Sequence, residues 1–196
     1  MKLHHLFAIT LFFNLTQAYA GDPAKGKALS QTCAVCHGVD GNSMNPIWPN
    51  LAGQHAAYIV RQLQDFKEGE RNNAQMSPMA ANLSEEDMQH LAADYASQKA
   101  EKGTGKPESL ELGEKIYRYV DAEAGIAGCM ACHGPAGEGN PAALYPALSS
   151  QHAAYTAAQL KMFKAGERGN AVMQAIAKPM TDAQIEAVSN YIQGLH

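Results

Sequence analysis

The sequence predicts an all-α protein built from two tandem copies of one small domain. Residues 49–76 and 146–173 align without gaps and share 17 identities in 28 positions, which indicates an internal duplication. Apolar residues recur at helical spacing in both copies, and little of the chain alternates as a strand would. The pentapeptide Cys-X-X-Cys-His also occurs once in each copy, and the two occurrences use all 4 cysteines of the 196-residue chain.

Three helices are expected in the first copy, each from its own signal. A helix over residues 23–31 leads into the first pentapeptide, and a second over residues 55–68 has apolar positions on one face. After Ser84, three acidic residues open a third helix that runs to about residue 98. The second copy repeats this pattern, with Thr181 and Asp182 at the start of its last helix. The residues expected to face inward in the first copy are Ile59, Leu63, Phe66, Leu91 and Tyr95.

The repeat sets the predicted domain boundaries. Domain 1 is expected over residues 21–100 and domain 2 over residues 108–196, with a charged, Gly-rich linker over 101–107. Domain 2 has about nine extra residues before its pentapeptide, in the stretch 119–128. Segments 42–48 and 138–144 are expected to be loops. Each copy is near the size at which a protein core alone is marginal, so the apoprotein is expected to fold poorly.

Residues 1–20 have the pattern of a secretory signal peptide. Lys2 precedes a mostly apolar run over 6–15, and Ala18-Tyr19-Ala20 fits a small-X-small cleavage site. The apolar run is too short to span a bilayer. Without Lys2 the mature chain has 14 basic and 19 acidic residues, a formal charge of −5. No basic run suggests nucleic acid, so the expected product is an exported, periplasmic protein that does not bind nucleic acid.

Each pentapeptide has the residue types that attach a c-type haem. Two thiolates one helical turn apart add to the vinyl groups of a porphyrin, and the adjacent imidazole binds its iron. Two covalent haems are therefore predicted. The expected attachment residues are Cys33, Cys36, Cys129 and Cys132, and the expected proximal iron ligands are His37 and His133.

Other interpretations of Cys-X-X-Cys explain less of the pattern. A redox dithiol explains neither the histidine that follows nor the recurrence 96 positions later, and it usually lies between a strand and a helix. A zinc site would need both pairs at one metal and would leave both histidines without a role. Two disulfides with such short loops would add little stability.

A distal ligand is expected later in each copy, and the repeat discriminates among the methionines. Met76 matches Met173 in the 97-residue register, whereas Met79 falls opposite an isoleucine and Met180 opposite a leucine. A ligand inherited by duplication should be present in both copies. Met76 and Met173 are therefore preferred as metal ligands, with Met79 and Met180 as the alternative pair and gap-filling core methionines as the other interpretation.

His55 and His152 also correspond, so bis-histidine ligation is a second alternative. Both lie at the start of a predicted helix, where a hydrogen bond to a loop carbonyl or to a propionate is the preferred role. Thioether ligation would give two centres of fairly high potential.

Two further expectations concern the surroundings of the irons. A carbonyl directly after each proximal histidine, at Gly38 or Gly134, is expected to accept its Nδ1–H. Trp48 is placed opposite Leu144, which predicts a larger aromatic wall in the first site.

The mature chain resembles the cytochrome c4 family, bacterial dihaem cytochromes with two class I-like domains. The resemblance rests on both pentapeptides, on the Gly134-Pro135 that follows the second, and on the duplicated Gln-His-Ala-Ala-Tyr and Gly-Glu-Arg segments. It implies two tandem cytochrome c-like haem domains whose haems face each other across the domain interface, with His/Met ligation at both irons. It further implies a periplasmic electron carrier, loosely membrane-associated, that delivers electrons to a haem–copper terminal oxidase.

Three classes of function compete for this pattern. The first is a diffusible carrier in a respiratory chain, fed by a donor such as a quinol-oxidising complex. The second is a haem subunit that accepts electrons from a dehydrogenase complex. The third is a dihaem enzyme, such as a peroxidase or a thiosulfate-oxidising cytochrome. Catalysis at haem needs an exchangeable distal position, and both copies retain an equivalent Met, so an electron carrier with no catalytic residues is preferred.

Overall fold

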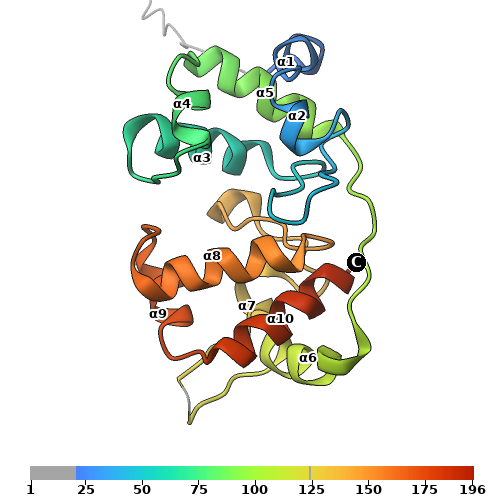
Figure 1. Ribbon diagram of the computed structural model, residues 1–196, viewed down its shortest axis with the longest axis vertical. Coiled ribbons are helices and arrows are strands. Elements are labelled where there is room, and N and C mark those ends of the chain that lie inside the picture. The colour runs from blue at the N-terminus through green and yellow to red at the C-terminus, as the bar shows by residue number, and fades with distance from the viewer. Residues whose placement is uncertain (1–20, 124) are drawn as a thin grey trace, which may run out of the picture.

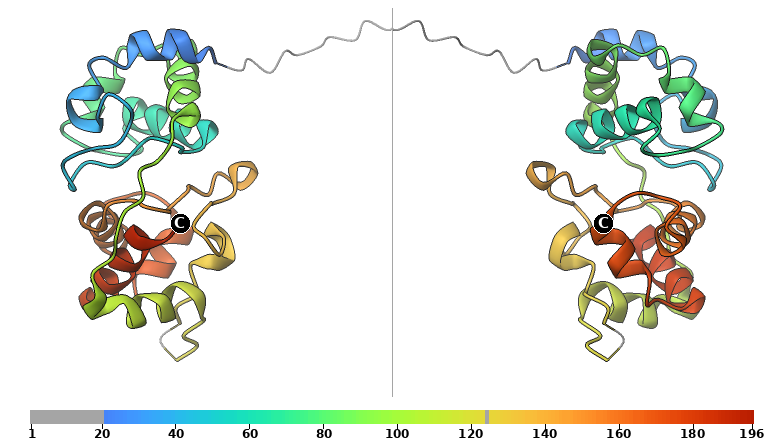
Figure 2. Two further views of the ribbon diagram at one scale, coloured as in Figure 1. Left: turned by 90° about the vertical axis from the view of Figure 1, so that its right-hand side faces the viewer. Right: turned by 90° about the vertical axis from the view of Figure 1, so that its left-hand side faces the viewer.

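The two copies of the repeat form two lobes stacked along the long axis of the molecule in this computed structural model (Figure 1). The structure describes residues 21–123 and 125–196, and the predicted signal peptide lies outside them. The segment between the lobes runs along one edge of the molecule, and both side views show the lobes as separate bodies with a common boundary (Figure 2). The predicted tandem, all-α architecture is confirmed.

The first lobe contains every helix expected there, with its boundaries within about two residues of the prediction. His55 is the N-cap of α3 and Ser84 the N-cap of α5. Ile59, Phe66, Leu91 and Tyr95 are buried as predicted, and Leu63 is half-buried. The helices of this lobe are α1 (Pro23–Leu29), α2 (Ala34–His37), α3 (Ala56–Glu68), α4 (Met76–Ala80) and α5 (Glu85–Ser97).

The second lobe repeats this order and adds short elements. Segment 138–144, expected to be a loop, contains a 3₁₀ turn because Pro141 fixes its first backbone angle and the Asn140 side chain caps it. The extra stretch 119–128 closes on itself through an isolated bridge between Asp121 and Ile126. The elements are η1 (Pro107–Ser109), α6 (Leu110–Arg118), α7 (Met130–His133), η2 (Pro141–Ala143), α8 (Ala153–Ala165), α9 (Ala171–Ala177) and α10 (Asp182–Gly194).

In each lobe the first and last long helices cross at a glycine. A Cβ on Gly26 of α1 would lie 2.0 Å from the carbonyl oxygen of His90 in α5. A Cβ on Gly113 of α6 would lie 2.3 Å from the carbonyl oxygen of Ala187 in α10. Both distances are far below van der Waals contact, so only glycine permits the two backbones to approach this closely.

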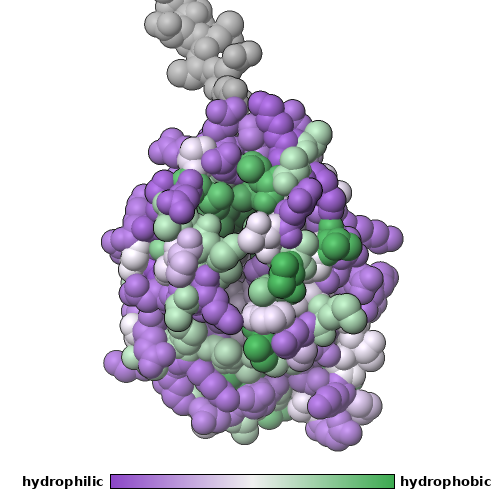
Figure 3. All heavy atoms as spheres, turned by 45° about the horizontal axis from the view of Figure 1, so that its top comes forward, coloured by the Kyte–Doolittle hydropathy of each residue, from purple (hydrophilic) through white to green (hydrophobic). Residues whose placement is uncertain are grey.

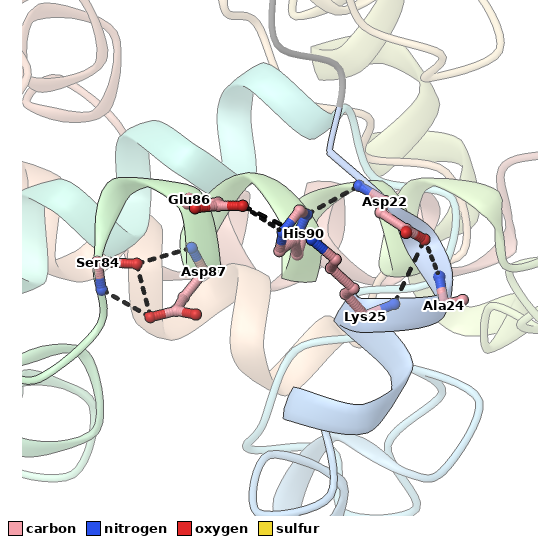
Figure 4. A network of polar contacts seen from close by, with 7 residues as sticks. All are labelled: Asp22, Ala24, Lys25, Ser84, Glu86, Asp87 and His90. Carbon is pink, nitrogen blue, oxygen red and sulfur yellow. Dashed lines mark hydrogen bonds and ion pairs between the residues drawn. The ribbon is translucent and has the colours of Figure 1, made fainter.

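The start of the described chain is held by a polar network on α5 (Figure 4). The backbone N–H of Asp22 donates to Nδ1 of His90 at 2.8 Å, while Nε2 of His90 lies 3.2 Å from Oε1 of Glu86. The carboxylate of Asp22 in turn caps α1 by accepting from the N–H of Ala24 at 2.9 Å. These contacts fix α1, and with it the entry into the first pentapeptide.

No helix within the described residues is long and apolar enough to cross a bilayer.

Candidate functional site

Each pentapeptide folds as one helical turn that brings its two thiols to the same side. In α2 the N–H of Cys36 donates to the carbonyl of Cys33 at 3.2 Å, and Cys132 repeats this bond to Cys129 at 3.2 Å. All four thiols are free. The two pairs lie in different lobes, α2 in the first and α7 in the second, so they cannot share one metal ion (Figure 1).

A carbonyl group fixes the ring of each histidine that was predicted to be a proximal ligand. Nδ1 of His37 lies 2.9 Å from the carbonyl oxygen of Pro49, and Nδ1 of His133 lies 3.0 Å from that of Pro146. The expectation that the carbonyl follows the histidine directly was wrong. Gly38 and Gly134 instead take positive φ angles of 81° and 78°, which turn the chain away from the helix. With Nδ1–H donated to a carbonyl, Nε2 is the nitrogen with a lone pair for a metal.

The protonation of these groups follows from burial. Desolvation lowers the pKa of His37 and of His133, and the bond to Pro49 or Pro146 only partly opposes it, so both rings are neutral at pH 7. Desolvation also raises the pKa of Cys129 to about 11. A neutral imidazole is the form that binds a transition metal.

The two preferred methionines occupy equivalent, half-buried positions. Met76 begins α4, and Met173 lies in the first turn of α9, where it packs against the apolar cluster of the second lobe. Their backbone N–H groups each donate at 2.9 Å to an asparagine side chain three residues earlier, Asn73 and Asn170 respectively.

The alternative methionine pair does not share one environment. Met79 is 42% exposed, whereas Met180 is 2% exposed inside the second core. A pair inherited by duplication is expected to occupy matched positions, and Met76 with Met173 does so.

The residues around each pentapeptide fit a covalently attached haem. The half-buried Cys33 packs against the apolar cluster of the first lobe, as Cys129 does in the second. Apolar side chains gather around a hollow on one face of the first lobe (Figure 3). The prediction of a larger aromatic wall in the first site missed Tyr145, which the ungapped register places opposite Trp48. The ring centroid of Tyr145 lies 6.1 Å from that of His133.

A reciprocal hydrogen-bond network joins the two lobes through α3 and α8. The guanidinium of Arg71 donates to Oε1 of Gln62 at 2.7 Å in its own lobe and to Oε1 of Gln159 at 2.8 Å across the boundary. Arg168 repeats this with Gln159 at 2.9 Å and Gln62 at 2.8 Å. Both arginines are buried. Each also donates to a tyrosine hydroxyl of the opposite lobe, Tyr155 for Arg71 and Tyr58 for Arg168.

His55 and His152 also lie at the interface between the two lobes. Nε2 of His55 lies 2.8 Å from the carbonyl oxygen of Glu138, and Nε2 of His152 lies 2.8 Å from that of Ser43. Both contacts cross between the lobes and reach loop carbonyls, which was the preferred role for these residues. Because these contacts use Nε2, the structure gives no support to bis-histidine ligation.

Two buried glutamines complete the boundary. Gln54 forms two hydrogen bonds with Ala147, each 2.9 Å long: its Nε2 donates to the carbonyl oxygen, and its Oε1 accepts from the backbone N–H. Gln151 pairs with Asn50 in the same way, again at 2.9 Å for both bonds.

Sequence reasoning missed these roles, although the signal was present. The identities between segments 49–76 and 146–173 include the prolines whose carbonyls bind the pentapeptide histidines, the asparagines that bind the backbone of the candidate methionines, and the glutamines and arginines between the lobes. These particular identities therefore lie either beside a candidate iron ligand or in the contact between the lobes.

Comparison with known proteins supports the same interpretation. The family model described as cytochrome c matches residues 23–93 and 111–196. Cytochrome c4 of Thiocapsa roseopersicina is 47% identical over 180 residues, which cover 89% of this chain and 93% of the relative. The thiosulfate dehydrogenase electron acceptor of Stutzerimonas stutzeri is 38% identical, covering 89% and 87%. The crystal structure of reduced cytochrome c4 from Pseudomonas stutzeri superposes with a TM-score of 0.88 at 42% identity, covering 90% of this chain and 100% of the other.

Proposed function

Because the chain belongs to the cytochrome c4 family and is a dihaem electron carrier with two covalent c-type haems, we propose that it works in the periplasm, in a respiratory chain. In this role it takes electrons from an upstream donor, such as a quinol-oxidising complex, and delivers them to a haem–copper terminal oxidase. The predicted signal peptide supports export, and the matched pair of sites supports a carrier.

The proposed ligand set is the one predicted from the sequence. Each haem supplies an iron that accepts and releases one electron. Cys33 and Cys36 attach the first haem, and His37 and Met76 hold its iron. The equivalent residues of the second lobe are Cys129, Cys132, His133 and Met173. The carbonyl groups of Pro49 and Pro146 keep the imidazole rings oriented, so coordination stays fixed during transfer.

One observation carries the proposal: the candidate histidines and methionines have equivalent hydrogen-bond partners in the two lobes, and the lobes meet in a reciprocal contact. Each candidate histidine is held in a fixed orientation by a proline carbonyl and each candidate methionine is capped by an asparagine, so the two sites match in these contacts. A boundary built from paired glutamines and arginines holds the lobes in one arrangement. Two fixed redox centres in a fixed arrangement suit a relay of electrons.

The test is stopped-flow mixing of the reduced, exported protein with a solubilised haem–copper oxidase. The expected result is oxidation of both haems at a rate that rises with oxidase concentration. Failure to reduce any oxidase, together with tight co-purification with a dehydrogenase, would contradict the carrier role.

A second candidate is an electron acceptor for a dehydrogenase. It is favoured by the relative from Stutzerimonas stutzeri whose name gives it this role for thiosulfate dehydrogenase. Mixing the oxidised protein with a thiosulfate dehydrogenase and thiosulfate distinguishes the two. Haem reduction that depends on enzyme and thiosulfate, with no subsequent oxidation by an oxidase, would favour the acceptor role.

A further inference from the structure

The peptide unit that orients each proximal histidine is bonded on its other side to the opposite lobe. The carbonyl of Pro49 accepts from Nδ1 of His37 at 2.9 Å. The N–H of the same peptide unit belongs to Asn50, and it donates to Oε1 of Gln151 at 2.9 Å. A glutamine of the second lobe is therefore one peptide group away from the proximal histidine of the first.

The second lobe shows the mirror image. The carbonyl of Pro146 accepts from Nδ1 of His133 at 3.0 Å. The N–H of that peptide unit belongs to Ala147, and it donates to Oε1 of Gln54 at 2.9 Å. The arrangement survives although Asn50 and Ala147 differ in side chain, because only their backbone groups take part.

Both glutamines are placed firmly enough to act on these peptide units. Gln54 and Gln151 are 9% and 8% exposed. Besides the bond to the N–H, each amide nitrogen donates to the carbonyl of the same partner residue at 2.9 Å, Ala147 for Gln54 and Asn50 for Gln151. The side chains are therefore fixed at both ends of the amide, in a setting where hydrogen bonds are electrostatically strong.

We propose that Gln54 and Gln151 are positioning residues that tune the haem of the opposite lobe, Gln54 acting on the second haem and Gln151 on the first. The inference rests on the proposed ligand assignment of His37 and His133. Each glutamine polarises the peptide group that holds the histidine across the boundary. The iron potential of one lobe is thus set in part by a side chain of the other.

The sign follows from the chemistry of the axial ligand. A peptide N–H that donates a hydrogen bond makes its own carbonyl a better acceptor, since bonds in a chain polarise one another. A stronger bond at Nδ1 makes the imidazole a more basic ligand. A more basic ligand stabilises ferric iron and lowers the potential. Removing the glutamine is therefore expected to raise the potential of the opposite haem.

The test is a spectroelectrochemical titration of exported dihaem protein carrying Gln54→Leu or Gln151→Leu. Gln54→Leu is expected to raise the potential of the second haem and to move the Nδ1–H proton resonance of His133 upfield. Gln151→Leu is expected to do the same to the first haem and to His37. Gln54→Glu preserves the side-chain size and offers a stronger, charged acceptor to the N–H of Ala147, while it loses the hydrogen bond that the amide nitrogen donates to the carbonyl of Ala147. It is expected to lower the second potential more than the first, which keeps the test available if the leucine variant fails to fold.

Gln62→Leu is the matched control. Gln62 is a glutamine of the same boundary that accepts from both arginines but touches neither proline peptide. Any general loosening of the boundary appears in this variant and is subtracted. Three results would overturn the inference. They are a larger shift in the potential of the haem in the glutamine's own lobe, equal shifts in the potentials of both haems, or no shift in potential beyond that of the control.

The two redox waves are assigned with Met76→His and Met173→His. If neither substitution lowers one wave selectively, the ligand assignment within the proposed function has failed. If both substitutions do so while the glutamine variants lack the crossed pattern, only the inference has failed.

Discussion

Among the described residues, 13 apolar side chains are buried in the second lobe and eight in the first. Part of the difference comes from the extra stretch 119–128, whose Ile126 is 1% exposed within the second cluster. The helix crossings differ as well, because α5 places His90 at the position that Ala187 takes in α10. Since the duplication, the two copies have thus kept the contacts of their candidate ligands and of the interface between the lobes, whereas their apolar interiors have diverged. The first lobe should depend more on its haem than the second.

The largest expected effect is the loss of one haem. Cys33→Ala with Cys36→Ala removes attachment in the first lobe, and Cys129→Ala with Cys132→Ala does so in the second. The first double variant should lose roughly 5 kcal/mol, about the whole stability of a small domain, because the eight buried apolar residues of this lobe are too few to form a stable core alone. The second lobe should retain part of its protection without haem.

Amide hydrogen exchange measures both variants lobe by lobe. Equal loss of protection in the two variants would show that the larger number of buried apolar residues in the second lobe does not stabilise it without haem. A cooperative, native-like melt of protein lacking both haems would contradict the dependence on haem altogether.

The next effect is on potential and should be confined to one lobe. Met173→His replaces a thioether with an imidazole and should lower the second haem's potential by roughly 0.1 V or more, within the roughly 0.8 V that axial ligands span. The first haem should change little, and Met76→His should give the mirror result. Potentiometric titration checks both variants, and equal shifts of the two waves would count against these ligands.

A smaller effect on stability is expected at the helix crossing, which in both lobes depends on a glycine. Gly26→Ala and Gly113→Ala each force a methyl group against a backbone carbonyl, at 2.0 and 2.3 Å. Each should cost about 1–3 kcal/mol, as overpacking of a tight contact does. Denaturant unfolding of the holoprotein provides the measurement. A glycine variant with wild-type stability would show that the helix crossing in that lobe relaxes freely.

The smallest expected effect is a difference in acid sensitivity between the helix caps. In the first lobe Ser84 and Asp87 cap α5 reciprocally, whereas Thr181 and Gln184 cap α10 with no titratable group. Hydrogen bonds from Ser84 hold the pKa of Asp87 below its ordinary value of 3.8. Its contribution is therefore present above about pH 4 and is lost as the pH falls through the lowered pKa.

Acidification should accordingly fray the first turn of α5 by about 0.5 kcal/mol, the low end for exposed caps, and affect α10 less, because the single first-turn carboxylate of α10, Asp182, takes no part in its cap. Exchange rates of the first-turn amides between pH 5 and 2.5 measure this. Asp87→Asn should reduce the pH dependence of α5 and leave only the share of the other first-turn carboxylates, Glu85 and Glu86. An unchanged dependence in that variant would assign the whole effect to those two groups.

The sequence predicted the fold through signals that are local. Helices α3 and α5 begin where His55 and Ser84 indicate, because caps and apolar spacing act within one or two turns. The spacing of each motif also predicted that its two cysteines and its histidine share one helical turn, as they do in α2 and α7.

What the sequence did not reveal was the set of partners between distant residues. The carbonyl that holds His37 belongs to Pro49, twelve positions away, and nothing in a single sequence links the two. Likewise the sequence indicates only that Gln54 lies near the start of a helix. Its partner Ala147 is identified only once the two lobes are stacked. The duplication did mark these positions as retained, but a retained residue is assigned to a pocket or to a boundary only by the tertiary structure.

The central claim is that each lobe holds one iron between an imidazole nitrogen and a methionine sulfur. Iron-edge X-ray absorption of the exported protein, together with its intact mass, tests this most directly. Two porphyrin adducts per chain, with one sulfur neighbour at each iron, are the predicted result. A mass without porphyrin, or irons with no sulfur in their coordination sphere, would contradict it.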